Sequence, residues 1–592
     1  MKTTTNVITV LYLALGIATA AAQATSNSQA SPQKIHEQLA LELLDKVIAE
    51  TPSLTLEENR LKLWLGAGEL LWERDEKRAR TLITQAIAEY TAFVGKEQSD
   101  WAAKKDMDEI LDRISPVTLR EELGRVLARL DPVLAWDFFT SSQLPPNKFQ
   151  ENVGRDGDAE QRLEMKIISQ AAHKNIPFAL EKAENHLTKY GFQNFTNEVR
   201  ELAARDKAAA AALTSAMTAS YKKLTDPFDY EKRAAMENLL RVALGANEFV
   251  LGAPSPASFA VNAKAPRLDD VSVNEVLEAL GAAALEAARK NTSEFGITHI
   301  FHSEATFTQL EKYLPKLAQQ IKKQTQQNLR NAPLERQKFY LARQNSPIET
   351  IEVLLTKAKA ASANDAKSYY YRAAASAAEG GDLLRARQII EEHFKEADRT
   401  FEIESFLAGI EKHELTESIK KVDVATTERL AAQQYSLSEK ITALAALAEN
   451  LAQAGERKKA AKILQDLRAE LGTQVTTRSQ LESHFRMARA YAQIDPSQGL
   501  AVLELTLPRL NDLVGAMATL QGIQKDALFR KGEMSFYEAN TPVAQLLANQ
   551  IGTLAILAKA EEQRVSELIE MYQRNEIKNW VRLTISQKLL EQ

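Results

Sequence analysis

The sequence predicts an all-α fold, an irregular superhelical stack of antiparallel helical hairpins. The chain has 592 residues with only 22 Gly and 17 Pro, and is rich in Ala, Leu, Glu and Lys, which favours helix throughout. No long run alternates apolar and polar residues as a half-buried strand does. One phrase recurs: an acidic residue, a small residue four places on, and bulky apolar residues at +7 and +8. Its copies are Asp75, Ala79, Leu82/Ile83; Asp131, Ala135, Phe138/Phe139; Asp382, Ala386, Ile389/Ile390; Glu456, Ala460, Ile463/Leu464; and Asp495, Gly499, Val502/Leu503.

The spacing of the phrase explains its meaning. Residues four, seven and eight places apart share one face of a helix, and an acid at the first position can cap that helix. Each copy therefore predicts the start of the second helix of a hairpin, with imperfect copies at Asp206 and Glu414. Successive acids from Asp382 through Glu414 and Glu456 to Asp495 are 32, 42 and 39 residues apart. These distances are typical of one helical hairpin per repeat.

The first 22 residues predict a signal peptide. One cation, Lys2, precedes the apolar run Val7 to Ala18, which is too short to span a bilayer. Small residues follow and fit cleavage before Gln23 or before Thr25. We therefore expect an exported bacterial protein, periplasmic or extracellular.

Composition excludes several kinds of attachment and partner. The chain has no cysteine, so we expect neither a lipoprotein nor a disulfide framework. No later segment is apolar enough for a membrane span. Net charge is −5 with both signs interspersed, so we expect no nucleic-acid partner.

The chain divides in order into blocks. After the signal peptide at 1–22, a polar tether is expected at 23–33 and an N-terminal helical block at 34–244, interrupted by a loop over Ser141 to Arg162. A loop or crossover containing Pro and Gly follows at 245–270, and its apolar residues favour an ordered crossover over a mobile linker. A middle helical block spans 271–345, and the C-terminal repeats span 346–592.

Individual hairpins can be marked out. Leu61 to Trp72 reads as a first helix and Glu76 to Tyr90 as its partner. In the last third, the first helices are expected at Tyr369 to Ala378, Ile441 to Ala454 and Phe485 to Gln493. Glycines at positions 380, 381, 455 and 472 suit helix ends, and Asp495-Pro496 suits a helix start.

Two of these runs resemble a known family. Ala488 to Leu503 (ARAYAQIDPSQGLAVL) and Ala445 to Leu464 are similar to tetratricopeptide-type hairpins, with small residues in the first helix and an acid at the turn. The match covers about a third of the chain, without the family's Trp-x-x-Leu-Gly start or a regular 34-residue period. The resemblance implies a tetratricopeptide-like α-solenoid.

The densest group of potential metal ligands is His299, His302 and Glu304. Two histidines three places apart would share a helix face, and a carboxylate could complete a site. A helix would turn Glu304 away from His302, however, and the HExxH pattern is absent. We therefore prefer an amphipathic segment that packs Ile300 and Phe301, and predict no metal site.

Glu482-Ser483-His484-Phe485 resembles the Glu-Ser-x-Phe segment of soluble lytic transglycosylases. That resemblance would make Glu482 the general acid/base for glycan cleavage, but no Gly-Leu-Met-Gln segment follows, and the repeat already accounts for a helix here. Glu404-Ser405-Phe406 departs from the family pattern in the same way.

The remaining sequence patterns do not indicate a catalytic or cofactor-binding site. Gly66-Ala67-Gly68 lacks the third glycine and the strand of a dinucleotide site, and no Gly-x-Ser-x-Gly elbow or P-loop occurs. The aromatics Tyr369, Tyr370, Tyr371, Trp64 and Trp72 either line a groove or, as we prefer, wedge between hairpins. The charge run Arg457 to Lys459 reads as a solvated face. We predict no catalytic, cofactor-binding or metal-binding residue.

The favoured function is therefore an exported protein-binding or scaffold module without catalysis of its own, since helical stacks display extended surfaces. The alternatives left open are a cell-envelope enzyme acting on glycan, with an unidentified site, and a structural or assembly component. The partner, the pathway and the oligomeric state do not follow from the sequence.

Overall fold

The computed structural model describes residues 32–103, 116–143, 157–224, 229–246, 266–290, 304–331, 350–395, 399–433, 436–520, 528–537 and 541–591. These residues form 25 α-helices, one 3-10 turn and one two-stranded sheet. The fold is an all-α stack of helical hairpins, as the sequence predicts. The signal peptide and nearly all of the tether lie outside the described residues; α2 begins at Pro32, inside the predicted tether.

The chain forms two compact units. Unit 1 combines Met1–Ile114 with Leu415–Gln592, and unit 2 is Ser115–Glu414. The boundary falls within one helix, α21 (Phe401–Lys420). The blocks expected from the sequence follow chain order and do not anticipate that the two ends of the chain share a unit.

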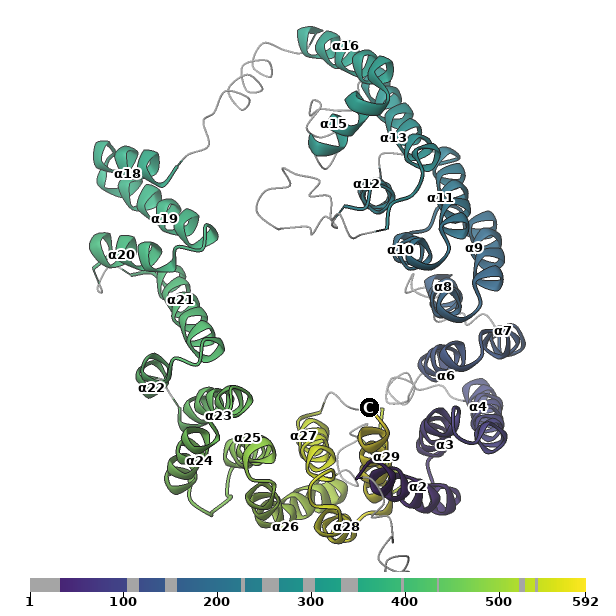
Figure 1. The fold of residues 1–592 in the computed structure, drawn as a ribbon, viewed down its shortest axis with the longest axis vertical. Helices are drawn as coiled ribbons and strands as arrows, with labels where there is room; N and C mark the ends of the chain where they lie inside the picture. Colours follow the sequence, from purple (N-terminus) through teal and green to yellow (C-terminus); the bar gives the residue numbers. More distant parts are fainter. Residues whose placement is uncertain are drawn as a thin grey trace, which may run out of the picture. The chain divides into compact units, whose positions relative to one another are not determined.

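Unit 1 consists of successive hairpins from both ends of the chain (Figure 1). In it, α3 packs on α4, α23 on α24 and on α25, and α25 on α26 and α27. Its elements are α2 (Pro32–Glu50), η1 (Thr51–Ser53), α3 (Glu57–Leu71), α4 (Glu76–Ala103), α22 (Val424–Ala432), α23 (Leu437–Gln453), α24 (Arg457–Leu471), α25 (Arg478–Ile494), α26 (Pro496–Leu520), β1 (Phe529–Arg530), β2 (Glu533–Met534), α27 (Pro542–Leu557), α28 (Glu562–Glu570) and α29 (Asn575–Leu590).

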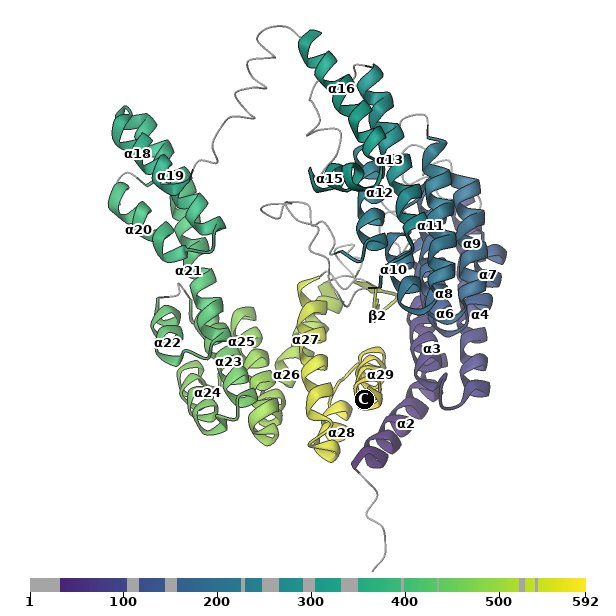
Figure 2. The ribbon, with the colours of Figure 1, turned by 45° about the horizontal axis from the view of Figure 1, so that its top comes forward.

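Unit 2 contains a longer run of helices around one apolar core, in which α8, α9, α11 and α13 lie side by side (Figure 2). A second, smaller core lies among α18 to α21. The elements are α6 (Pro116–Leu130), α7 (Pro132–Ser141), α8 (Gly157–Lys174), α9 (Ile176–Tyr190), α10 (Thr196–Arg205), α11 (Lys207–Lys222), α12 (Tyr230–Ala243), α13 (Asp270–Lys290), α15 (Glu304–Tyr313), α16 (Pro315–Asn331), α18 (Ile351–Ala360), α19 (Ala363–Glu379) and α20 (Leu383–His393), followed by α21.

The recurring phrase marks helix starts, as predicted. The acids at 75, 131, 206, 382 and 495 each accept hydrogen bonds from backbone N–H groups in the first turn of the following helix. The small residues four places on are buried, and so are the apolar residues at +7 and +8. The phrase therefore records a capped helix whose first turns pack closely on a neighbour.

Two copies of the phrase depart from this pattern. Glu456 occupies the N-cap of α24 but makes no side-chain capping bond, and its carboxylate pairs with Lys459 at 3.3 Å. The prediction at Glu414 is wrong, because this residue lies inside α21, where the apolar face of Ile403, Leu407 and Ile410 continues without a break.

Helix ends follow the glycine prediction. After α23, Gly455 has φ +87°, its N–H donates to Ala452, and the N–H of Glu456 donates to Leu451. A residue with a β-carbon is strained at this φ, so glycine allows the last carbonyls of α23 to be satisfied before α24 begins. Gly381 ends α19 with the same pair of bonds.

The first predicted loop is shorter than expected, and the second is described only at its two ends. In the first, α8 already begins at Gly157, so residues 157–162 are helical and do not belong to the loop. In the second, Leu268 is buried and its N–H donates to Ala243 at 3.0 Å, which fixes the approach to α13. Residues 247–265 lie outside the described part of the chain.

Between α26 and α27 lies a tight β-hairpin that the sequence analysis did not anticipate. Phe529 pairs with Met534, and Arg530 pairs with Glu533. The two turn residues, Lys531 and Gly532, have φ +48° and +82°. Positive φ at both positions is what a type I′ turn requires.

Candidate functional site

The most distinctive arrangement in the described residues is the seam, which we define as the contact of α2 and residues 54–62 with α29 and residues 528–537, all within unit 1. Helix α2 packs against α29, and α3 also packs against α29. The hydroxyl of Ser586 donates to the carbonyl of Ala40 at 3.0 Å, and both residues are fully buried. The seam thus joins the beginning and the end of the described chain.

A glycine permits the close approach of α3 to α29. A β-carbon placed on Gly66 would lie 2.7 Å from Leu583 Cδ2, so a side chain there would displace Leu583. On the same helix, a β-carbon on Gly68 would lie 2.9 Å from Ile83 Cγ1 of α4. The Gly66-Ala67-Gly68 motif therefore serves helix packing on two sides of α3.

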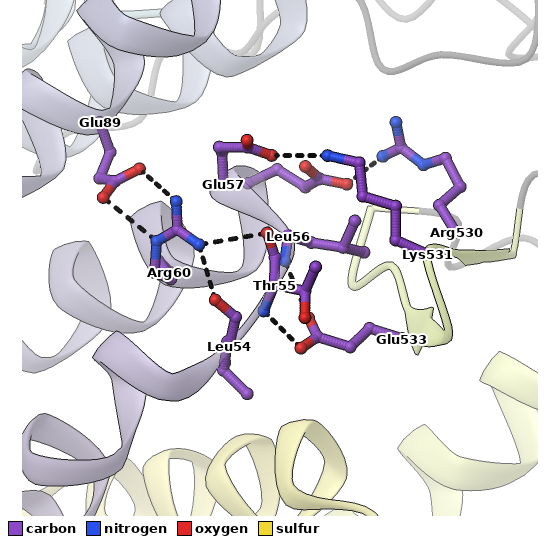
Figure 3. A network of polar contacts seen from close by, with 10 residues as sticks. Leu54, Thr55, Leu56, Glu57, Arg60, Glu89, Arg530, Lys531 and Glu533 are labelled. Atoms are coloured by element: carbon purple, nitrogen blue, oxygen red, sulfur yellow. Dashed lines mark hydrogen bonds and ion pairs between the residues drawn. The ribbon is translucent and has the colours of Figure 1, made fainter.

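A carboxylate from the β-hairpin holds the start of α3 (Figure 3). Glu533 accepts from the backbone N–H groups of Thr55 and Leu56, the latter at 3.0 Å. Arg60 lies beside them, donating to the carbonyl of Leu54 at 2.6 Å and pairing with Glu89 at 2.9 Å. The entry to α3 is thus fixed by charged groups on both sides.

Two further ion pairs cross the seam. Glu58, which is 1% exposed, pairs with Arg530, and Glu57 pairs with Lys531 at 3.6 Å. Burial raises the pKa of Glu58, and the Arg530 charge opposes this shift without cancelling it. The ionised carboxylate is therefore less favourable here than in water.

Amide and guanidinium groups complete the seam. Asn59 donates to the carbonyl of Met534 at 2.8 Å and accepts from the N–H of Phe536 at 3.1 Å, as a neighbouring strand would. Arg582 is 3% exposed and pairs with Glu50 and Glu570, each at 2.7 Å. Asn59 thus aligns α3 with β2 and the residues after it, and Arg582 joins α29 to the end of α2.

A cavity of about 310 Å³ lies at one end of the seam. His36, Arg74 and Lys559 line it, and each lies near the carbonyl oxygen of a residue at the end of α27 or α29, at 3.0, 3.5 and 3.3 Å. Arg74 and Lys559 are cations near helix C-termini, a favourable placement that gives these two groups a structural explanation. Gln33, Glu37, Leu589, Leu590 and Glu591 complete the lining.

A second candidate is the first-helix face, formed by the exposed and half-buried polar side chains of the adjacent first helices α23 and α25. Arg486 donates to Thr442, Arg489 lies 4.0 Å from Glu449, and Gln453 donates to Gln493 at 3.4 Å. Burial raises the pKa of Glu449, and Arg489 opposes that shift. The face comprises Ser438, Thr442, Glu449, Gln453, Arg478, Glu482, Arg486, Arg489 and Gln493.

Unit 2 holds a buried titratable pair between α8 and α9. His186 Nδ1 lies 3.1 Å from Glu164 Oε1, and Lys189 Nζ lies 3.6 Å from the other carboxylate oxygen. Burial alone would raise the pKa of Glu164, but His186 and Lys189 outweigh it and hold the pKa below its ordinary value. His186 also packs against Tyr190 and Phe195, so the pair belongs to the helix packing.

The glycan-enzyme candidate Glu482 lies on α25, where it pairs with Arg478 at 2.8 Å. The three residues that follow it are buried, and the ring nitrogens of His484 lie 2.8 and 3.3 Å from the carbonyls of Gln480 and Gly472. Glu404 is exposed on α21, 3.8 Å from Arg399. Glu482 belongs to unit 1 and Glu404 to unit 2.

Of the metal candidate, His299 and His302 lie outside the described residues, and Glu304 is the first residue of α15. Within the described ranges, no group of three or more His, Asp or Glu side chains is placed to hold a metal ion.

No helix in the described ranges is long and apolar enough to cross a bilayer.

The aromatic residues pack between helices, the interpretation preferred from the sequence. Tyr370 stacks on His393 with ring centroids 3.5 Å apart, and Tyr371 meets Phe406 edge to face at 5.5 Å. Tyr369 packs on the same core. Trp64 and Trp72 are buried, and Arg80 lies over the Trp72 ring. The run Arg457 to Lys459 is exposed on α24.

Sequence reasoning missed the residues of the seam. Glu58, Asn59 and Arg582 are polar residues on helix faces that are otherwise apolar, and such positions are the one signal that could have drawn attention to them. Their partners lie more than 470 residues away for Glu58 and Asn59, so no local pattern connects the two sides.

Comparison with known proteins identifies no family for this chain. No family model and no curated protein matches the sequence. The chain is similar to a solved structure described as a "circular tandem repeat protein with novel repeat topology and enhanced subunit contact surfaces", at 14% identity over 93% of this chain and 99% of that chain, with a TM-score of 0.14. The all-α hairpin fold follows from the packing of the helices themselves.

Proposed function

We propose that this is an exported protein that binds another protein along the first-helix face and acts as a scaffold or binding module without catalysis of its own. The observation that carries the proposal is the side-by-side placement of α23 and α25, whose polar side chains meet at Thr442 and Arg486 and again at Gln453 and Gln493. Neighbouring repeats that present aligned rows of side chains form an extended surface, which suits a macromolecular partner.

The chemistry of the face supports a protein partner. Arginines 478, 486 and 489 are exposed, and amides and hydroxyls lie between them. Arginine is enriched at protein interfaces, where its planar fork forms several directed hydrogen bonds. The mild net charge of −5 gives no support to a nucleic-acid partner.

Affinity capture with chemical cross-linking tests the proposal. The mature chain is used as bait in a cell-envelope extract, and cross-linked peptides are mapped. We expect partner cross-links close to α23 and α25, and their loss when Arg486→Glu and Arg489→Glu are combined. The matched control combines Arg457→Glu and Lys458→Glu, which make the same charge change on α24. Equal capture by both double variants would contradict the proposed face.

Export is part of the proposal and rests on residues 1–22. A short apolar run followed by small residues is typical of a cleaved signal peptide. N-terminal sequencing of the exported protein should find Gln23 or Thr25 as the first residue. A cell-associated, folded protein that retains Met1 would contradict export.

A further inference from the structure

The N-terminal helices α2, α3 and α4 form a segment with packing of its own. Helix α3 packs along α4, where Gly68 of α3 approaches the buried Ile83 of α4 closely. Helix α2 contacts α3 and η1. The segment can therefore keep much of its internal packing when its outward contacts change.

Its outward contacts in unit 1 are mainly the seam, and His36 and Lys46 of α2 also pair with Glu562 and Glu570 of α28. Helices α2 and α3 pack on α29, and residues 54–62 bind the β-hairpin and the residues that follow it. The contacts are specific, because Glu533, Asn59 and Arg582 each match a particular partner on the other side. The seam thus resembles an interface between two bodies more than the interior of one hairpin.

The polar part of the seam adds little net free energy to closure. On separation, Glu58 and Arg530 regain water, and the removal of such groups from water offsets most of the attraction between them. The raised pKa of Glu58 agrees with this, since its charge is costly when the seam is closed.

The apolar side chains of the seam, by contrast, must be buried against another surface. Helix α2 buries Ala40, Leu43, Leu44 and Val47, and α29 buries Val581, Ile585 and Leu589. Burial of such side chains is the main favourable contribution to packing, so these surfaces do not stay open in water. The surface that fits each of them in shape and in hydrogen bonding is the one it meets in the closed chain, and a second copy offers the same surface.

We propose that α2–α4 is an exchangeable segment, which in a dimer leaves its own chain and packs on α29 and the β-hairpin of a second copy. Both forms contain the same seam contacts, as in other exchanges of identical elements between protomers. Their balance therefore depends on protein concentration. This inference goes beyond the proposed partner binding and does not depend on it.

Single-cysteine variants test the exchange, because the natural chain has no cysteine. His36 Nε2 on α2 and Glu562 Oε1 on α28 lie 3.3 Å apart beside the seam, and both side chains are partly exposed. A His36→Cys chain carrying a size tag is mixed with an untagged Glu562→Cys chain, equilibrated at several concentrations and treated with a short bismaleimide. We expect a hybrid dimer band whose share rises with concentration.

The matched control pair is Lys440→Cys and Glu470→Cys, which lie 2.7 Å apart within the α23–α24 hairpin and should give no hybrid. A chain carrying both His36→Cys and Glu562→Cys should cross-link to itself at low concentration, and circular dichroism should show that all variants are helical. Self-cross-linking of that chain without any hybrid band in the mixture would overturn the exchange. A hybrid band of equal strength for the control pair would overturn it too.

Discussion

The carboxylate of Glu533 accepts a hydrogen bond from the backbone N–H of Leu56 at 3.0 Å, although 477 residues separate the two in sequence. Leu56 is the N-cap residue of α3, and its apolar side chain supplies no capping bond. A helix start near the beginning of the chain is thus completed by a side chain from near its end.

Replacement of Glu533 should weaken unit 1. In Glu533→Ala the N–H groups of Thr55 and Leu56 lose their acceptor, which for a helix cap costs about 0.5–2 kcal/mol. Urea unfolding followed by circular dichroism measures this loss. The control is Glu73→Ala, at an exposed position after α3, which should change stability by less. Equal effects of the two variants would contradict a capping role for Glu533.

Ionisation of the Glu58 carboxyl should lower the free energy of unfolding as pH rises. Its folded-state pKa lies above the ordinary value of 4.5, so the folded chain holds this proton more tightly than the unfolded chain. Its destabilising contribution is absent below the unfolded pKa and fully developed above the raised folded pKa. In Glu58→Gln this contribution disappears, so the melting temperature of the variant minus that of the natural chain should increase across this window. A difference that stays constant with pH would show that Glu58 does not titrate in this way.

In the repeat copy that begins at Glu456, the small residue Ala460 should contribute more to stability than the acid. Ala460 is fully buried, and Ala460→Leu should cost roughly 1–3 kcal/mol because the added carbons have no space. Glu456 makes no side-chain capping bond, so Glu456→Ala should cost less. Thermal unfolding of the two variants compares them directly. A neutral Ala460→Leu would mean that this position is not a close helix contact.

Two glycines of α26 should respond in opposite ways to alanine. A β-carbon on Gly499 would lie 3.0 Å from the carbonyl oxygen of Ala488 and 3.2 Å from Leu557, so Gly499→Ala should destabilise the packing of α25 and α26. A β-carbon on Gly515 meets nothing within 4 Å, so Gly515→Ala should stabilise by up to about 1 kcal/mol through helix propensity. The denaturant midpoint should be lower for Gly499→Ala than for Gly515→Ala. The reverse order would contradict both assignments.

The sequence predicts local structure well, because its signals are local. The acids at 131, 206 and 382 cap helices through bonds to residues two or three places on, and the small residues after them are buried. The same reasoning failed at Glu414, where nothing local tells a helix start from a helix interior with the same spacing.

Distant pairing could not be predicted, because it depends on surfaces that no period in the sequence connects. Nothing around Asn59 indicates that its amide binds the backbone at Met534 and Phe536, and nothing near Glu533 indicates a helix start as its partner. The candidate binding face depends on a similar fact, since Arg486 and Thr442 lie 44 residues apart and meet only when two repeats stack.

The seam cannot form until late in synthesis, because its two sides lie far apart in the sequence. Residues 54–59 leave the ribosome early, but Glu533 follows Leu56 by 477 residues, a delay of about 25–100 s at 5–20 residues per second. Throughout that interval α2 and α3 lack α29, and the apolar side of α2 has no native cover. Because α29 is made long after α2, a chain released before α29 is made would leave the apolar side of α2 exposed for aggregation or for binding by a chaperone.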